Sequence, residues 1–109
     1  MLSNASQAVV DPSKVRDYLL SSSHPVGRFK AAIFFALGYS QLDWETLSNA
    51  LLVIAQTGDA RSGEPSTFGQ KYEVSAMLNG PNGRSRRVKT IWLVESEASA
   101  RRFVTAYPE

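Results

Sequence analysis

His24 is the single histidine in this 109-residue chain, and imidazole is the side chain best suited to moving protons near neutral pH. The run Ser23-His24-Pro25 predicts the start of a helix, because proline favours the first helical position. At about 100° per residue, His24 and Arg28 share one face of that helix. A histidine beside a cation at a helix start could act as a general base or contact a phosphate. The alternative is that His24 only caps the helix.

Arg28 and Lys30 are the two cations of this helix, and their spacing of two residues places them on different faces. Either could contact a phosphate, remain a solvated charge or pair with Asp17. The alignment with His24 favours Arg28. The apolar face of the helix is expected to consist of Val26, Phe29, Ile33, Ala36 and Leu37.

A strand is expected over about residues 86–95, where Thr90 and Trp92 share one face and Lys89 lies on the other. A hydroxyl beside an indole suits a surface that holds a phosphate and stacks on a base. The alternative is that Trp92 belongs to the core under the helices.

A last strand is expected over residues 103–107, with Thr105 and Tyr107 on one face. If this face coincides with the one that carries the indole of the preceding strand, hydroxyls and aromatic rings line a single sheet surface. Lys71 or Arg86 would lie at its rim. The alternative is that Tyr107 is also a core residue.

The charge of the chain is unevenly distributed, although its net value is only +2. Residues 1–65 hold five cations and six acids, whereas residues 66–109 hold seven cations and four acids, so the halves carry −1 and +3. The expected hairpin over residues 71–94 holds five of these cations, and such a surface suits RNA or DNA. The alternative is that Arg84, Arg86 and Arg87 form a solvated turn.

The composition excludes several kinds of site. Without cysteine the chain has no disulfide or thiolate ligand, and one histidine is too few for a multi-histidine metal centre. No P-loop, dinucleotide-binding glycine pattern, Gly-x-Ser-x-Gly elbow or His-Glu-x-x-His motif is present. We therefore expect neither a cofactor nor a metal; a carboxylate-only magnesium site is the remaining alternative, but no tight cluster of Asp and Glu supports it. The first residues lack the pattern of a signal peptide, and no apolar run is long enough to span a membrane, so a cytoplasmic protein without a membrane partner is expected.

The order of elements predicts a single α+β domain over residues 1–109. A helical half (residues 11–57) holds three helices: the first starts at Asp11-Pro12, the second ends at Gly38, and the third runs from a capping box at Ser40 to Gly58. A mobile loop (residues 58–69) and a sheet half (residues 70–108) follow. We expect the three N-terminal helices to pack on one face of a small antiparallel β-meander of three to four strands.

Short segments along nearly the whole chain resemble a small bacterial domain family, domain of unknown function 6883. The most specific are His24-Pro25-Val26-Gly27-Arg28-Phe29-Lys30-Ala31 and Thr105-Ala106-Tyr107-Pro108; the others are residues 8–11, 14–20, 69–72, 80–84 and 90–92. The layout of that family is similar to metal-independent ribonuclease toxins of the barnase/EndoU/colicin/RelE-like group. The resemblance therefore implies that the positions to test are His24, Arg28, Lys30, Lys71, Thr90 and Thr105.

The leading hypothesis is a toxin-like ribonuclease that cleaves RNA by metal-free attack of a 2′-hydroxyl. His24 would move the proton, Arg28 and Lys71 would stabilise phosphate charge, and Thr105 would position the phosphate. The expected substrate-binding residues are Lys30, Arg86, Lys89, Thr90, Trp92 and Tyr107. A cognate antitoxin or immunity protein would be its partner. The alternatives are a non-catalytic nucleic-acid-binding module and a protein-interaction module.

Overall fold

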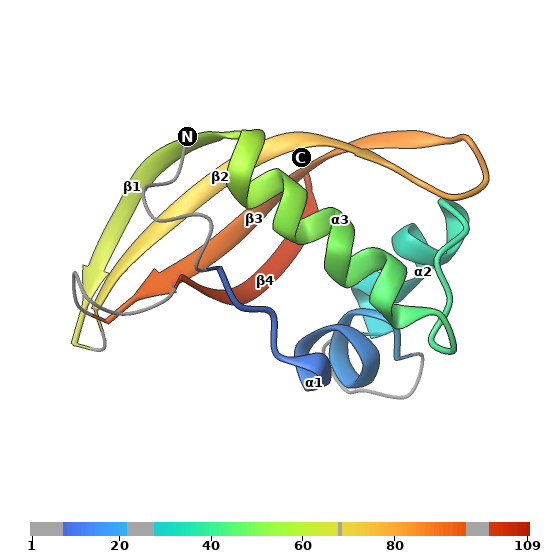
Figure 1. The fold of residues 1–109 in the computed structure, drawn as a ribbon, viewed down its shortest axis with the longest axis horizontal. Helices are drawn as coiled ribbons and strands as arrows, with labels where there is room; N and C mark the ends of the chain where they lie inside the picture. The colour runs from blue at the N-terminus through green and yellow to red at the C-terminus, as the bar shows by residue number, and fades with distance from the viewer. Residues whose placement is uncertain (1–7, 22–27, 68, 96–100) are drawn as a thin grey trace.

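The computed structural model describes residues 8–21, 28–67, 69–95 and 101–109 (Figure 1). Its elements follow the order α1 (Pro12–Lys14), η2 (Val15–Leu19), α2 (Arg28–Ala36), α3 (Trp44–Thr57), β1 (Asp59–Ser66), β2 (Gly69–Asn79), β3 (Ser85–Val94) and β4 (Arg102–Pro108). The strands form one antiparallel sheet in the order β1-β2-β3-β4. The expected α+β class with a meander of up to four strands is confirmed. None of the described helices is long and apolar enough to cross a membrane.

The first helix begins at the predicted cap. The Asp11 carboxylate accepts a hydrogen bond from the Ser13 backbone N–H at 2.9 Å, with Pro12 at the first helical position. The chain then widens into the π-helix η2, in which the Leu20 N–H reaches the Val15 carbonyl at 2.9 Å. The sequence carries no signal for this wider turn.

Gly38 ends α2 as predicted, with a positive φ of 96°. The Tyr39 N–H bonds to the Phe34 carbonyl at 3.1 Å and the Gly38 N–H to the Phe35 carbonyl at 2.9 Å. These two bonds form a Schellman motif, which satisfies the last carbonyls of the helix. The predicted start of this helix at residues 23–25 lies outside the described residues.

The predicted apolar face of α2 is wrong in part. Ala31, Phe34 and Leu37 are buried, whereas Ile33 is half-buried and Ala36 is exposed. Residues 31–37 are apolar at every position, so hydrophobic periodicity does not identify which side faces the core.

The third helix begins at Trp44 with Asp43 at its N-cap, three residues later than the predicted cap at Ser40. The Ser40 hydroxyl nevertheless accepts a hydrogen bond from the Asp43 N–H at 3.2 Å, which is one half of a capping box. Leu47, Leu51 and Ile54 are buried along one face of α3, and the helix stops at Gly58 as expected.

Residues 58–69 are not the expected mobile loop, because residues 59–66 form the edge strand β1. Backbone pairing with β2 holds this strand, with Arg61 opposite Glu73, and the register shifts between Ser62 and Pro65. The strand has no β-branched or aromatic residue, so its composition gave no signal for a strand. The sheet therefore begins at residue 59 rather than 70.

The β2–β3 hairpin is anchored to the end of α2. The Asn82 side chain donates to the Ala36 carbonyl at 2.9 Å. A Cβ atom at Gly80 would collide with the Leu37 carbonyl oxygen, so only glycine fits there. Gly83 has a positive φ of 87°, as its predicted turn position requires.

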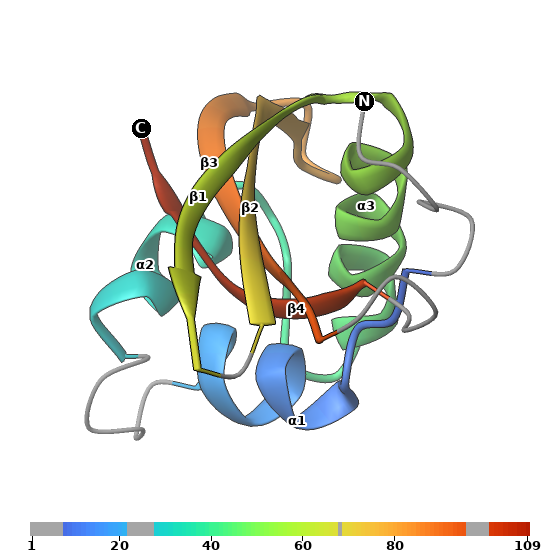
Figure 2. The same cartoon turned by 90° about the vertical axis from the view of Figure 1, so that its left-hand side faces the viewer.

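The helices do not form one layer on one face of the sheet, contrary to expectation. In Figure 1, α3 crosses one face, with α1 and η2 at one end of it. Figure 2 shows α2 on the other side of the sheet from α3. Side chains of α2 therefore reach both the core, through Phe34, and the β4 side of the sheet, through Lys30.

The core lies between α3 and the inner face of the sheet. Strand residues buried on this face include Val74, Leu78, Val88, Trp92 and Ala106. We call the opposite side, which carries Lys71, Lys89, Thr105 and Tyr107, the outer face of the sheet.

Candidate functional site

Three elements meet at the ammonium group of Lys30. This group donates a hydrogen bond to the Tyr18 hydroxyl of η2 at 2.9 Å and another to Thr105 Oγ1 of β4 at 2.8 Å. It also lies 5.2 Å from the centre of the Tyr18 ring and 5.7 Å from that of Tyr107. We call these four residues the Lys30 cluster.

The charge of Lys30 is unusual because it is partly buried without an acidic partner among the described residues. None of the ion pairs in the described part of the chain involves its nitrogen. The aromatic rings and two oxygen acceptors stabilise the cation only in part. An ammonium group has three N–H donors, and two are used here. The third donor and the uncompensated charge suit an anion such as a phosphate.

A β-bulge brings Thr105 to this cluster. Trp92 pairs with Phe103, but Ile91 pairs with Thr105, so one residue of β4 is extra at this point. The extra residue moves Thr105 to the outer face, beside Tyr107. If Val104 instead continued the regular alternation from buried Phe103, the Thr105 hydroxyl would point toward the core.

The hydroxyl of Tyr18 lies in an environment that favours its ionised form. Partial burial would raise the pKa of Tyr18, but hydrogen bonds with Lys30 and Thr105 and the charges of Lys30 and Lys14 outweigh it, so the pKa lies below its ordinary value. Sequence reasoning missed Tyr18, because the π-turn that directs it to Lys30 has no sequence signal.

The outer face extends the positive surface away from the Lys30 cluster. Lys89 lies opposite Tyr107 and pairs with Glu73 at 3.2 Å; the hydrogen bond and charge of Glu73 raise the pKa of Lys89. Lys71 is exposed on the same face, but β3 separates it from Thr105, a distance of about 10 Å across the strands. Lys71 is therefore placed to contact a neighbouring part of a ligand, not the group bound at Lys30.

The prediction that Thr90 and Trp92 contact a substrate is wrong. Both side chains are completely buried on the inner face. Trp92 Nε1 donates to Thr90 Oγ1 at 2.8 Å, and Thr90 in turn donates to the Val74 carbonyl at 2.8 Å. The faces of the last two strands thus do not coincide, and Trp92 is the core residue of the alternative interpretation.

Arg86 lies at the tip of the β2–β3 hairpin, apart from the Lys30 cluster. With Arg84 it borders a groove of about 300 Å³ against α2, which also includes Ala32, Ile33, Ala36, Leu37 and Ser85. Arg84 and Arg86 are exposed, and neither forms an ion pair within the described part of the chain.

His24 and the side chain of Arg28 lie outside the described residues, so their expected roles remain predictions.

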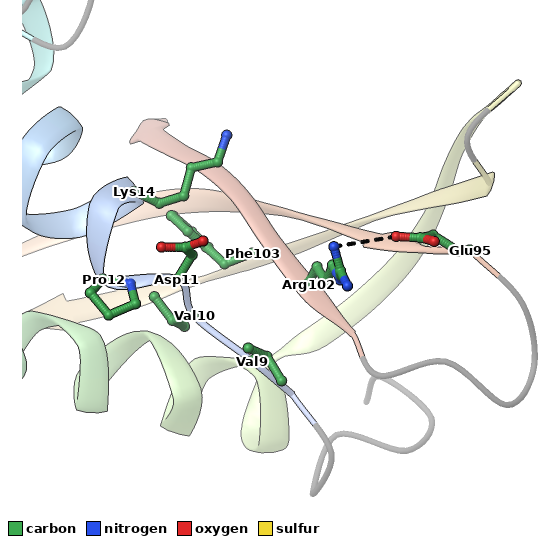
Figure 3. A pocket seen from close by; sticks show the side chains of 8 residues that line it. All are labelled: Val9, Val10, Asp11, Pro12, Lys14, Glu95, Arg102 and Phe103. Atoms are coloured by element: carbon green, nitrogen blue, oxygen red, sulfur yellow. Dashed lines mark ion pairs between the residues drawn. The ribbon is translucent and has the colours of Figure 1, made fainter.

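A hollow larger than the groove beside Arg86 lies elsewhere in the described part of the molecule (Figure 3). Its volume is about 630 Å³, and it is bordered by the N-terminal segment and β4 through Val9, Val10, Asp11, Pro12, Lys14, Glu95, Arg102 and Phe103. Arg102 pairs with Glu95 at 3.5 Å, and Asp11 is bound by Ser13, so three of its charged groups are engaged within the chain. None of its residues belongs to the Lys30 cluster.

The described residues contain no group of three His, Cys, Asp or Glu side chains that could hold a metal ion. The Lys30 cluster itself offers a fixed cation, two phenols and a hydroxyl. Such a set can bind an anion, orient it and exchange protons with it.

Comparison with curated proteins finds no match. Among solved structures, a chain of the "Contact-dependent growth inhibition toxin - immunity protein complex from Klebsiella pneumoniae 342" is similar, with a TM-score of 0.71 and 21% identity over 93% of this chain and 99% of that chain. At this identity the similarity shows a shared fold. The family model described as Domain of unknown function (DUF6883) matches residues 1–109, which confirms the resemblance in sequence, and the chain belongs to this family.

Proposed function

We propose that this chain is a toxin-like ribonuclease whose active site is built around the Lys30 cluster. The observation that carries the proposal is the Lys30 ammonium, held by Tyr18 and Thr105 with one donor free and no described carboxylate nearby. The fold shared with a chain of a toxin–immunity complex gives independent support.

The reaction we propose is attack of a ribose 2′-oxygen on the adjacent phosphorus. The O2′–P bond forms and the P–O5′ bond breaks, which leaves a cyclic phosphate and a 5′-hydroxyl. Negative charge grows on the phosphate oxygens in the transition state. A preorganised ammonium aimed at them stabilises that charge more than it stabilises the ground state.

Thr105 and Tyr107 would fix this geometry. Thr105 Oγ1 holds the Lys30 nitrogen at 2.8 Å, and the Tyr107 ring lies beside it where a base or ribose could pack. Lys71 and Lys89 on the outer face would contact phosphates farther along the strand. In this proposal His24 moves a proton and Arg28 adds charge to the phosphate.

The direct test incubates purified protein with total RNA in the presence of EDTA. Wild type should cleave RNA, and Lys30→Ala should lower kcat by about 10²–10³-fold, as for loss of one preorganised donor. Arg102→Met is the matched control, since it removes a positive charge from an exposed ion pair outside the cluster. His24→Ala tests the proton-transfer role. RNA that stays intact with wild type across pH values and substrates would sink the proposal.

A toxic ribonuclease would need a neutralising partner, and we propose an immunity-type protein for this role. The similar structure from Klebsiella pneumoniae is itself a complex of a toxin with an immunity protein, which supports a partner of this kind. Expression of this chain alone should arrest growth, and co-expression of a neighbouring gene should restore it. Normal growth without any partner would count against this part of the proposal.

A second candidate is a non-catalytic nucleic-acid-binding module, favoured by Arg84 and Arg86 at the hairpin tip, which pair with no acid among the described residues. It predicts RNA or DNA binding without cleavage, weaker at high salt. The double variant Arg84→Ser, Arg86→Ser should then reduce both the affinity and its salt dependence. Cleavage by wild type together with unchanged binding by this variant would decide for the enzyme.

A further inference from the structure

Tyr18 presents its hydroxyl oxygen to the Lys30 cluster from a π-helical turn. The Lys30 ammonium donates to this oxygen at 2.9 Å, so the phenol acts as an acceptor in the contact. The five-residue π-helix Val15–Leu19 carries Tyr18, and π-turns inside helices recur at functional sites. In a regular α-helix, which has fewer residues per turn than a π-helix, the Tyr18 side chain would point in a different direction around the helix axis.

The groups that face Tyr18 favour a negative charge on its oxygen. Lys30 faces it from α2, Thr105 from β4 and Lys14 from α1, so two cations and one hydroxyl surround it. The acid nearest in sequence is Asp17, which Arg16 binds through two nitrogens, each at 3.1 Å. Against the effect of burial, the influences that lower the pKa of Tyr18 come from Lys30, Thr105 and Lys14.

We propose that Tyr18 is the general base of the reaction, an inference that rests on the proposed ribonuclease function. The Tyr18 phenolate accepts the proton of the 2′-hydroxyl while the O2′–P bond forms. The P–O5′ bond breaks, and the leaving 5′-oxygen takes a proton from solvent. The 2′-hydroxyl gives one proton to Tyr18 and the 5′-oxygen gains one, so the step balances without an oxidant.

In this assignment, Lys30 and Tyr18 have separate roles within the Lys30 cluster. The Lys30 ammonium stabilises the phenolate through one N–H and leaves another for the phosphate, which brings base and phosphate to the same cation. The lowered pKa of Tyr18 has the direction that a base working nearer to neutral pH requires. Tyr39 shows the opposite case, because burial raises its pKa.

The first measurement follows tyrosine ionisation by ultraviolet absorbance as pH is raised. Wild type should show an early step, below the range of an ordinary tyrosine. Tyr18→Phe should remove this step, and Lys30→Met should move it to higher pH. Tyr39→Phe, which changes a tyrosine bound to the Asn79 carbonyl outside the cluster, should keep it. An early step that survives Tyr18→Phe would overturn the assignment.

The second measurement is the pH dependence of RNA cleavage. For Tyr18→Phe, kcat should fall by about 10²–10⁴-fold with little change in KM, and the limb that rises with pH should disappear. If this variant unfolds, fluorotyrosine at position 18 keeps the side chain and lowers its intrinsic pKa, so the limb should move to lower pH.

The outcomes separate the two proposals. Wild type that cleaves RNA, with a rising limb that neither substitution alters, would overturn the role of Tyr18 and leave the ribonuclease function standing. Wild type that cleaves no RNA at any pH would overturn both. A limb that moves with fluorotyrosine would support both.

Discussion

Replacing Lys30 by methionine removes the charge at the centre of the Lys30 cluster while keeping most of the length of the side chain. Two hydrogen bonds are lost, to Tyr18 and to Thr105, each worth about 1 kcal/mol of stability. The substitution also removes a partly buried cation that has no described acidic partner, which returns a desolvation cost of about 1–3 kcal/mol. The free energy of unfolding should therefore change by no more than about 1 kcal/mol.

The effect on RNA cleavage should be far larger than the effect on stability. Loss of a preorganised donor at a developing negative charge lowers kcat by about 10²–10³-fold, or roughly 2.7–4 kcal/mol of transition-state stabilisation. Urea unfolding and the cleavage rate, measured on the same preparation, separate the two quantities. Arg102→Met should change neither by much, because exposed ion pairs contribute less than about 1 kcal/mol.

Two results would refute this reasoning. A loss of more than about 3 kcal/mol in unfolding free energy would mean that Lys30 is mainly a structural tie between helices and sheet. Unchanged cleavage by a folded Lys30→Met variant would mean that the ammonium does not contact the reacting phosphate.

Three further predictions concern the frame around the site. Gly80→Ala should lower the unfolding free energy by roughly 1–3 kcal/mol, because its Cβ meets the Leu37 carbonyl; an unchanged urea midpoint would contradict this. Trp92→Phe should cost about 2 kcal/mol, since it leaves space in the core and removes the donor to Thr90; near-UV circular dichroism and urea unfolding would show it. The folded state lowers the pKa of Tyr18, so stability should rise with pH from the folded pKa up to the unfolded one. Tyr18→Phe should lack this alkaline gain, and an identical pH dependence in both proteins would disprove it.

Local signals in the sequence located one end of each of the three predicted helices. Asp11 caps the first helix, Gly38 closes the second and Gly58 stops the third, because a cap depends on the residue itself and its immediate neighbours. The direction in which a helix faces depends on distant packing instead. For α2, an almost wholly apolar sequence left that direction undetermined, and the predicted face was wrong in part.

The edge strand β1 was missed for a related reason. Backbone hydrogen bonds to β2 hold β1 in the sheet. Its polar sequence with Gly63 has no alternation of apolar and polar residues that would predict a strand. The charge imbalance between the two halves of the chain did indicate a positive sheet. It did not indicate that Lys89 and Arg87 would be paired with acids at 3.2 and 3.5 Å.

Three of the four residues in the Lys30 cluster were predicted from the sequence, but the geometry that brings them together was not. Lys30, Thr105 and Tyr107 were all expected to contact a ligand, and the structure brings them together with Tyr18. Two features that assemble the cluster, the π-turn at Tyr18 and the bulge in β4, are shifts of one residue in otherwise regular elements. Each shift turns one side chain from its regular direction toward the same cation, and neither leaves a mark in residue type or spacing.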